Sequence, residues 1–248
     1  MTGQHGPVTS GGAMIIDGGT TELAMIVVDG TAAPPWIVVL TGLAAVAAVV
    51  PRWTWRNSGH LDTIVHEGGH AFVAYLLGHW VFGVWLFSDT SGLTGTYGRP
   101  SRLVNFLVSA AGYAAPPAFG LGAAVLLNAD HITATLILAL VALVALFLVV
   151  RNRFGILIVT GASSVIILAL CSASASTQSA LACFLTWFLL LSGPRAVLDL
   201  HRARKKGSSS SDADMMAELT GIPGVFWVLG FGALAMVCLF HGTRLLLS

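Results

Sequence analysis

The sequence has little charge. Only 9 % of its 248 residues are Asp, Glu, Lys or Arg, whereas 56 % are hydrophobic, and the mean hydropathy is +0.84. Such a chain carries more apolar surface than one soluble core can hide, which excludes an ordinary soluble globular domain. The net charge is +1, and no basic stripe with interleaved aromatic residues occurs, so nucleic acid is not expected as a partner. The composition predicts an integral membrane protein.

Cysteine is also scarce. Cys171, Cys183 and Cys238 lie in apolar runs without metal-ligand spacing, and their odd number argues against a disulfide framework. We therefore interpret them as small buried packing residues. Residues 1–30 lack a basic segment followed by a continuous apolar core, so no cleavable signal peptide is expected. Residues 1–33 are predicted to form an N-terminal tail.

Seven apolar runs follow this tail, separated by proline, glycine and basic residues. They lie near residues 36–50, 61–78, 103–127, 132–150, 154–171, 180–192 and 224–240. The longer runs approach the roughly 20 apolar residues that a transmembrane helix needs. The sequence predicts an all-α polytopic membrane protein with about six to seven transmembrane helices, all in one membrane domain over residues 34–248.

The second run contains the motif HEGGH at residues 66–70. In a helix, residues four apart lie on one face, so the two imidazoles point the same way and Glu67 lies beside them. Two neutral imidazoles can hold Zn²⁺, the metal lowers the pKa of its water, and an adjacent carboxylate takes the proton. The motif therefore predicts a zinc site with His66 and His70 as ligands and Glu67 as general base. The alternative, a structural pair of histidines inside a helix bundle, would not require a buried carboxylate or two mid-helix glycines.

β-Forming residues follow the motif directly. Residues 80–87 are rich in Val, Phe and Trp, residues 88–92 have turn chemistry, and residues 93–98 resemble a second strand, which predicts a β-hairpin over residues 80–98. An ordinary extracytoplasmic loop is the alternative. Basic residues after the first, fourth and sixth runs all fall on the cytoplasmic side only if the hairpin is re-entrant. This topology places the HEGGH motif inside the membrane near its cytoplasmic face.

A catalytic zinc site needs a third protein ligand and one open position. His79, His131 and His241 lie at the ends of apolar runs, and we interpret them as interfacial or hydrogen-bonded histidines. Asp199 and Asp212 remain as candidates near the cytoplasmic face. Asp199 lies among arginines, so a solvated ion pair is its alternative role. Asp212 follows a serine before a short helical segment, so a helix N-cap is its alternative role.

Together these motifs resemble the site-2 protease family of intramembrane zinc metalloproteases, in particular a bacterial branch with HEGGH and Ser-Asp-Ala elements. The segments that carry the resemblance are Thr63 to Gly78, Ser88 to Thr94, Ala111 to Tyr113, Ser211 to Asp214 and Pro223 to Trp227. The resemblance covers most of residues 60–240. It implies one Zn²⁺ per chain, held by His66, His70 and an aspartate, with Glu67 as the base.

Two aspartates fit different branches of the family. In the better-known members a proline lies five residues before the ligand and glycines follow it. Pro194 and Asp199 reproduce the first spacing, but Leu200 and His201 replace the glycines. In the bacterial branch the recurring element is Ser-Asp-Ala, which occurs here around Asp212. We favour Asp212 as the third ligand and keep Asp199 as the alternative.

The resemblance implies that the chain hydrolyses peptide bonds of membrane proteins near the cytoplasmic face, as in regulated intramembrane proteolysis. The expected partners are a transmembrane protein substrate and membrane lipid, and the expected location is the bacterial plasma membrane, crossed several times. The alternative is a non-proteolytic metal-binding membrane protein, either an inactive regulator or a transporter. The presence of Glu67 and the clustering of the candidate ligands near one face favour the protease.

Overall fold

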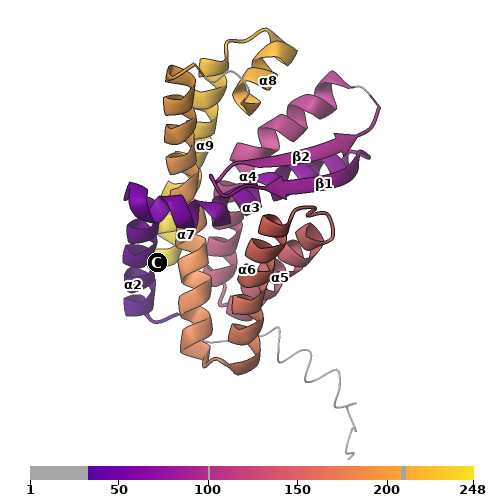
Figure 1. Cartoon of the computed structure of the whole chain (residues 1–248). Helices are drawn as coiled ribbons and strands as arrows, with labels where there is room; N and C mark the ends of the chain where they lie inside the picture. The colour runs from indigo at the N-terminus through magenta and orange to yellow at the C-terminus, as the bar shows by residue number, and fades with distance from the viewer. Residues whose placement is uncertain (1–32, 100, 208–210) are drawn as a thin grey trace, which may run out of the picture.

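The fold is described from a computed structural model that covers residues 33–99, 101–207 and 211–248. These residues are mostly helical, with one two-stranded antiparallel sheet (Figure 1). The elements in chain order are α2 (Pro35–Val49), α3 (Arg52–Leu76), β1 (Trp80–Leu86), β2 (Gly92–Tyr97), α4 (Arg102–Asn128), α5 (Ile132–Phe147), α6 (Arg153–Ser172), α7 (Ala175–Lys205), α8 (Asp212–Thr220) and α9 (Gly224–Leu247). The predicted N-terminal tail lies outside the described residues, except for Ala33.

Within the described residues, four helices are long and apolar enough to cross a membrane, namely α4, α6, α7 and α9. Helices α2 and α3 meet this condition only as a pair, and they are bent by 104° relative to each other. Helix α5 has only 16 residues. The prediction of a mostly helical membrane protein is confirmed, with four candidate spans, or five if the bent pair is one span. The predicted count of six to seven is not confirmed.

Helix α3 begins nine residues earlier than the predicted run at Leu61. Pro51 forms the corner after α2, and the basic residues that follow the first apolar run belong to the start of α3. Two hydroxyls from this part of α3 satisfy carbonyl groups that the end of α2 leaves free: Thr54 Oγ1 donates to the Ala47 oxygen at 2.8 Å, and Ser58 Oγ donates to the Ala48 oxygen at 2.7 Å. These bonds fix the corner between the two helices.

Helix α7 continues past the predicted end at residue 192 and includes Pro194. The basic segment after this proline, which lies beyond the predicted apolar run, is helical. Asp199 pairs with Arg195 four residues before it and with Arg202 three residues after it, which supports the helix. Cationic side chains in the last turn also interact favourably with the helix dipole.

Helix α7 lies at the centre of the molecule and packs against α2, α4 and α9. The Trp187 indole donates to the Val38 carbonyl at 3.0 Å and joins α7 to α2. Cys183 and Cys238 are buried, as expected of packing residues. The predicted burial of Cys171 is wrong. Its side chain is exposed because it lies on the outer face of α6, near the end of that helix.

The predicted β-hairpin is confirmed. Strands β1 and β2 pair antiparallel and lie alongside α3 (Figure 1). The outer edge of β1 is covered by the segment after α5, because the Val84 N–H donates to the Val149 carbonyl and the Arg151 N–H donates to the Val84 carbonyl. In the turn, hydrogen bonds from Ser91 hold the pKa of Asp89 below its ordinary value. The re-entrant position of the hairpin remains a prediction.

Candidate metal centre

Helix α3 presents the motif residues as its period requires. The Nε2 atoms of His66 and His70 lie 3.1 Å apart, and the two rings meet edge to face. Glu67 and His70 are buried, and His66 is half-buried. A Glu67 carboxylate oxygen and the two ring nitrogens lie within 4.8 Å of one another, a spacing that allows the group to hold a metal ion.

Helix α8 brings Asp212 to the two histidines. Asp212 Oδ2 lies 3.2 Å from His66 Nε2 and 3.4 Å from His70 Nε2. Tetrahedral zinc, with bonds of about 2.0 to 2.2 Å to nitrogen and oxygen, separates neighbouring ligand atoms by about 3.3 to 3.6 Å. The three atoms form a triangle of nearly this size. The donor set, two imidazoles and one carboxylate, therefore fits zinc with one position left open.

The start of α8 is capped by Ser211 and Asp214, so the Asp212 side chain is not used as a helix cap and contacts the histidines instead. Ser211 is the N-cap residue, and both its N–H and its hydroxyl donate to Asp214 Oδ2, at 3.1 and 2.5 Å. Arg204 of α7 also pairs with Asp214. Burial raises the pKa of Asp214, but these hydrogen bonds outweigh burial and hold the pKa below its ordinary value. The N-cap role that was the alternative for Asp212 therefore belongs to Ser211.

The protonation state of Asp212 follows from its burial and from its contacts with His66 and His70. Burial raises the pKa of its carboxyl, but hydrogen bonds from His66 and His70 have the larger combined effect. The pKa of Asp212 therefore lies well below its ordinary value, and the side chain is a carboxylate. A carboxylate is the protonation state that a metal requires.

The hairpin covers Glu67. Thr94 Oγ1 on β2 donates to Glu67 Oε2 at 2.6 Å and to the Glu67 carbonyl at 3.2 Å. At Gly92, the first residue of β2, an added Cβ would lie 2.5 Å from both Cγ and Oε1 of Glu67. The missing side chain at this position lets the strand lie directly against the carboxylate.

Helix α4 closes the other side of the site. The Val108 carbonyl lies 2.6 Å from His70 Nδ1, so it fixes the ring with Nε2 turned towards His66 and Asp212. At Gly112, an added Cβ would lie 2.4 Å from His70 Nε2 and 2.6 Å from His66 Nε2. The Tyr113 ring meets His66 edge to face with centroids 4.7 Å apart. Glycine at position 112 therefore leaves the space beside both candidate ligand atoms.

Asp62 is a residue of the site that sequence reasoning missed. It lies one helical turn before His66 on the same face of α3 and is buried. Its Oδ1 atom has no hydrogen-bond partner among the described residues, and Ser192 of α7 faces its carboxyl group. An acidic residue four positions before the motif in an apolar run was the available signal, because its i, i+4 spacing continues that of the two histidines.

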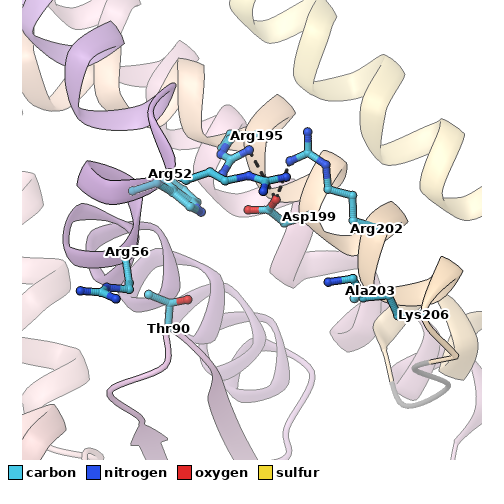
Figure 2. Close-up of a pocket in the computed structure, with 9 residues that line it drawn as sticks. Arg52, Arg56, Thr90, Arg195, Asp199, Arg202, Ala203 and Lys206 are labelled. Carbon is cyan, nitrogen blue, oxygen red and sulfur yellow. Dashed lines mark hydrogen bonds and ion pairs between the residues drawn. The ribbon is translucent and has the colours of Figure 1, made fainter.

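The structure does not bring Asp199 to the histidines. Its carboxylate pairs with Arg195 at 3.4 Å and with Arg202 at 3.0 Å, and it lines a separate basic pocket (Figure 2). Asp199 therefore forms the ion pair that the sequence offered as its alternative role.

A family model described as Peptidase M50B-like matches residues 39–242, which include the motif helix, the hairpin and Asp212. Comparisons with curated proteins and with solved structures found no match. The family model covers most of the chain and agrees with the resemblance described above. The chain belongs to the Peptidase M50B-like family and thus to the site-2 protease family of membrane metallopeptidases.

Proposed function

We propose that the chain is an intramembrane zinc metalloprotease that cleaves transmembrane protein substrates near the cytoplasmic face of a bacterial plasma membrane. In this proposal His66, His70 and Asp212 hold one Zn²⁺ and Glu67 is the general base. One observation carries it: three ligand atoms from two distant segments form a triangle with sides of 3.1, 3.2 and 3.4 Å, next to a buried carboxylate. A purely structural pair of histidines would not require this arrangement.

The chain's own residues would divide the chemistry among them. A zinc ion held by the three ligands would polarise the substrate carbonyl and lower the pKa of the attacking water. Glu67 would take the proton from this water and pass it to the leaving amine. Thr94 holds one oxygen of Glu67 by a hydrogen bond, so the other oxygen remains available for the proton. The hairpin on one side and α4 on the other restrict the access of bulk water.

A substrate helix must unwind before cleavage, because its backbone is protected by its own hydrogen bonds. We propose that the extended substrate pairs with β2 as an added strand. The edge of β1 is already covered, whereas the outer edge of β2 has no backbone partner in the part of the chain that the structure describes. Strand β2 also contacts Glu67, so a segment paired with this edge would lie near the base.

Strand addition can be tested with synthetic transmembrane peptides that carry a single N-methyl group at successive positions around the cleaved bond. Only alternate amides of an added strand bond to its partner. We therefore expect N-methylation to reduce the rate of cleavage at every second position and to leave it unchanged at the positions between. Alanine substitutions at the same positions control for side-chain effects. Equal cleavage of all the N-methylated peptides would contradict strand addition.

The cytoplasmic placement is supported by basic residues on α3 and α7. Basic residues from two helices line one pocket (Figure 2). They are Arg52 and Arg56 at the start of α3, the helix that carries the motif, and Arg202 and Lys206 near the end of α7, the helix that precedes α8. Clusters of Arg and Lys next to membrane spans favour the cytoplasmic side.

Proteolysis can be tested by co-expressing the chain with a panel of single-span substrates and following their cleavage. We expect cleavage by the wild type and none by Glu67→Gln, while the bound zinc is retained. Glu218→Gln is the matched control, because Glu218 is an exposed glutamate on α8. Zinc binding without cleavage of any substrate would favour the alternative, an inactive regulator or a transporter.

A further inference from the structure

A pocket of about 430 Å³, separate from the candidate metal centre, lies between the start of α3, the hairpin turn and the end of α7 (Figure 2). Its lining residues are Arg52, Trp55, Arg56, Thr90, Arg195, Asp199, Arg202, Ala203 and Lys206. The proposed proteolysis assigns no role to this pocket. Its volume falls within the range typical of small-molecule sites.

The pocket is strongly cationic. Four guanidinium groups and one ammonium group line it, against a single carboxylate. That carboxylate, on Asp199, is already paired with Arg195 and Arg202. No carboxylate pairs with Arg52, Arg56 or Lys206 in residues 33–99, 101–207 and 211–248. The pocket therefore keeps an excess of positive charge without an internal partner.

One buried donor atom of a residue that lines the pocket also has no partner among the described residues. The Nε atom of Arg195 is buried and makes no hydrogen bond with any described residue. The Arg195 guanidinium lies over the Trp55 ring, 5.6 Å from its centroid, which holds the side chain in place. An unpaired buried donor costs free energy unless a ligand satisfies it. A fixed guanidinium is well suited to bind a phosphate.

Apolar side chains lie next to the basic residues in the chain. Val50 is 61 % exposed and Trp53 is 76 % exposed on either side of Arg52, and Leu198 is 52 % exposed next to Asp199. Cationic and exposed apolar groups thus occur together at this end of α3 and α7. A phospholipid presents the matching pair of groups, an anionic headgroup attached to acyl chains.

We propose that this pocket binds the headgroup phosphate of an anionic phospholipid. Basic pockets between membrane helices on the cytoplasmic side are suited to anionic headgroups. Thr90 of the hairpin turn lines the pocket, and its carbonyl accepts a hydrogen bond from Thr63 Oγ1 of α3 at 2.8 Å. A bound headgroup would brace α3, the hairpin turn and α7 against one another.

The proposal can be tested by native mass spectrometry of the delipidated full chain in detergent. The chain is titrated with short-chain phosphatidylglycerol, phosphatidylcholine or inorganic phosphate. We expect one phosphatidylglycerol to bind per chain, with about twenty-five-fold lower affinity in the double variant Arg202→Gln/Lys206→Gln, since each cation contributes about a fivefold effect. Both residues are exposed, so these changes should not disturb folding, which a melting curve checks.

The matched control is Arg99→Gln/Arg102→Gln, which removes the same charge at two exposed arginines outside the pocket. We expect this variant to bind phosphatidylglycerol as the wild type does. Equal loss in both double variants, or equally tight binding of phosphatidylcholine, would overturn the proposal. Displacement of the lipid by inorganic phosphate at equal concentration would show a free-phosphate site, and displacement by an Asp-rich peptide at lower concentration would show a substrate site. Loss of cleavage by Glu67→Gln bears on the proteolysis alone and leaves this proposal unaffected.

Discussion

At the scale of single residues, the space at the candidate metal centre depends on Gly112. An added Cβ would lie within 2.6 Å of both histidine Nε2 atoms, closer than real Cβ contacts come. We expect Gly112→Ala to lower zinc affinity at least about tenfold, because the methyl group would displace one or both ligands. Zinc affinity is measured by competition with a chromogenic chelator.

Gly122→Ala provides the control for this change. Gly122 lies on the same helix, and nothing lies within 4 Å of a Cβ added there. Alanine at this position should bind zinc normally and leave stability unchanged or slightly raised. Wild-type zinc affinity in Gly112→Ala would contradict the role given to this glycine.

The buried carboxyl of Asp62 leads to a second prediction at this scale. One helical turn separates it from His66, and its Oδ1 atom has no hydrogen-bond partner in the described chain. Carboxylates next to a ligand histidine orient its ring, and their loss typically lowers metal affinity by about 10- to 100-fold. We expect Asp62→Ala to lower zinc affinity in this range.

Ser192→Ala is the control for Asp62→Ala. It removes the hydroxyl of α7 that faces the Asp62 carboxyl but leaves the carboxyl group itself in place, one helical turn before His66. We expect this variant to keep wild-type zinc affinity. If Asp62→Ala binds zinc as tightly as the wild type, or if Ser192→Ala weakens binding as much as Asp62→Ala, the positioning role of Asp62 is refuted.

At the scale of elements, the hairpin acts on the site through Thr94. Its hydroxyl donates to Glu67 Oε2 at 2.6 Å. Thr94→Val keeps the shape of the side chain but removes the donor, so we expect kcat to fall about tenfold while KM and zinc content stay unchanged. Thr94→Ser should restore the rate. A lower zinc content, or a normal rate, in Thr94→Val would contradict this positioning role.

Helix α8 depends on its attachment to α7. Arg204 bonds to Asp214 and to Ser211, the two residues that form the start of α8 next to Asp212. A charge-assisted hydrogen bond contributes about 1.5 to 3 kcal/mol, so Arg204→Gln should weaken zinc binding about tenfold or more by loosening α8.

Lys205→Gln is the control for this helix, because it removes a neighbouring exposed charge that has no ion-pair partner among the described residues. We expect its zinc affinity to match the wild type. Equal zinc affinity in Arg204→Gln and Lys205→Gln would show that the contact between α7 and α8 does not position Asp212.

At the scale of the whole molecule, the features that the sequence predicted are the local ones. The HEGGH motif predicted two imidazoles on one helix face with Glu67 beside them, because the helical period alone fixes their spacing. The hairpin was predictable from its β-forming residues and turn. The contact of Asp212 with the histidines depends on how α8 packs against α4 and α9, which no local pattern encodes. Sequence spacing alone therefore left Asp199 and Asp212 as alternatives.

The bounds of the helices and the number of membrane spans also depend on tertiary contacts. Hydroxyls of α3 bond to carbonyl groups at the end of α2, so the chain turns at Pro51 and α3 begins before the apolar run at Leu61. Helix α5 ends before the predicted residue 150, because the chain leaves it to cover the edge of β1. A hydropathy pattern contains neither type of contact.

The measurement that tests the central claim most directly is the zinc content and zinc affinity of the purified full chain in four forms: wild type, Glu67→Gln, Asp212→Ala and Asp199→Ala. We expect one zinc per chain in the wild type, retained in Glu67→Gln and Asp199→Ala, and greatly weakened binding in Asp212→Ala, because only Asp212 lies beside the histidine nitrogens. A wild type without zinc would contradict the metalloprotease. Loss of zinc in Asp199→Ala with retention in Asp212→Ala would contradict the assigned ligand set.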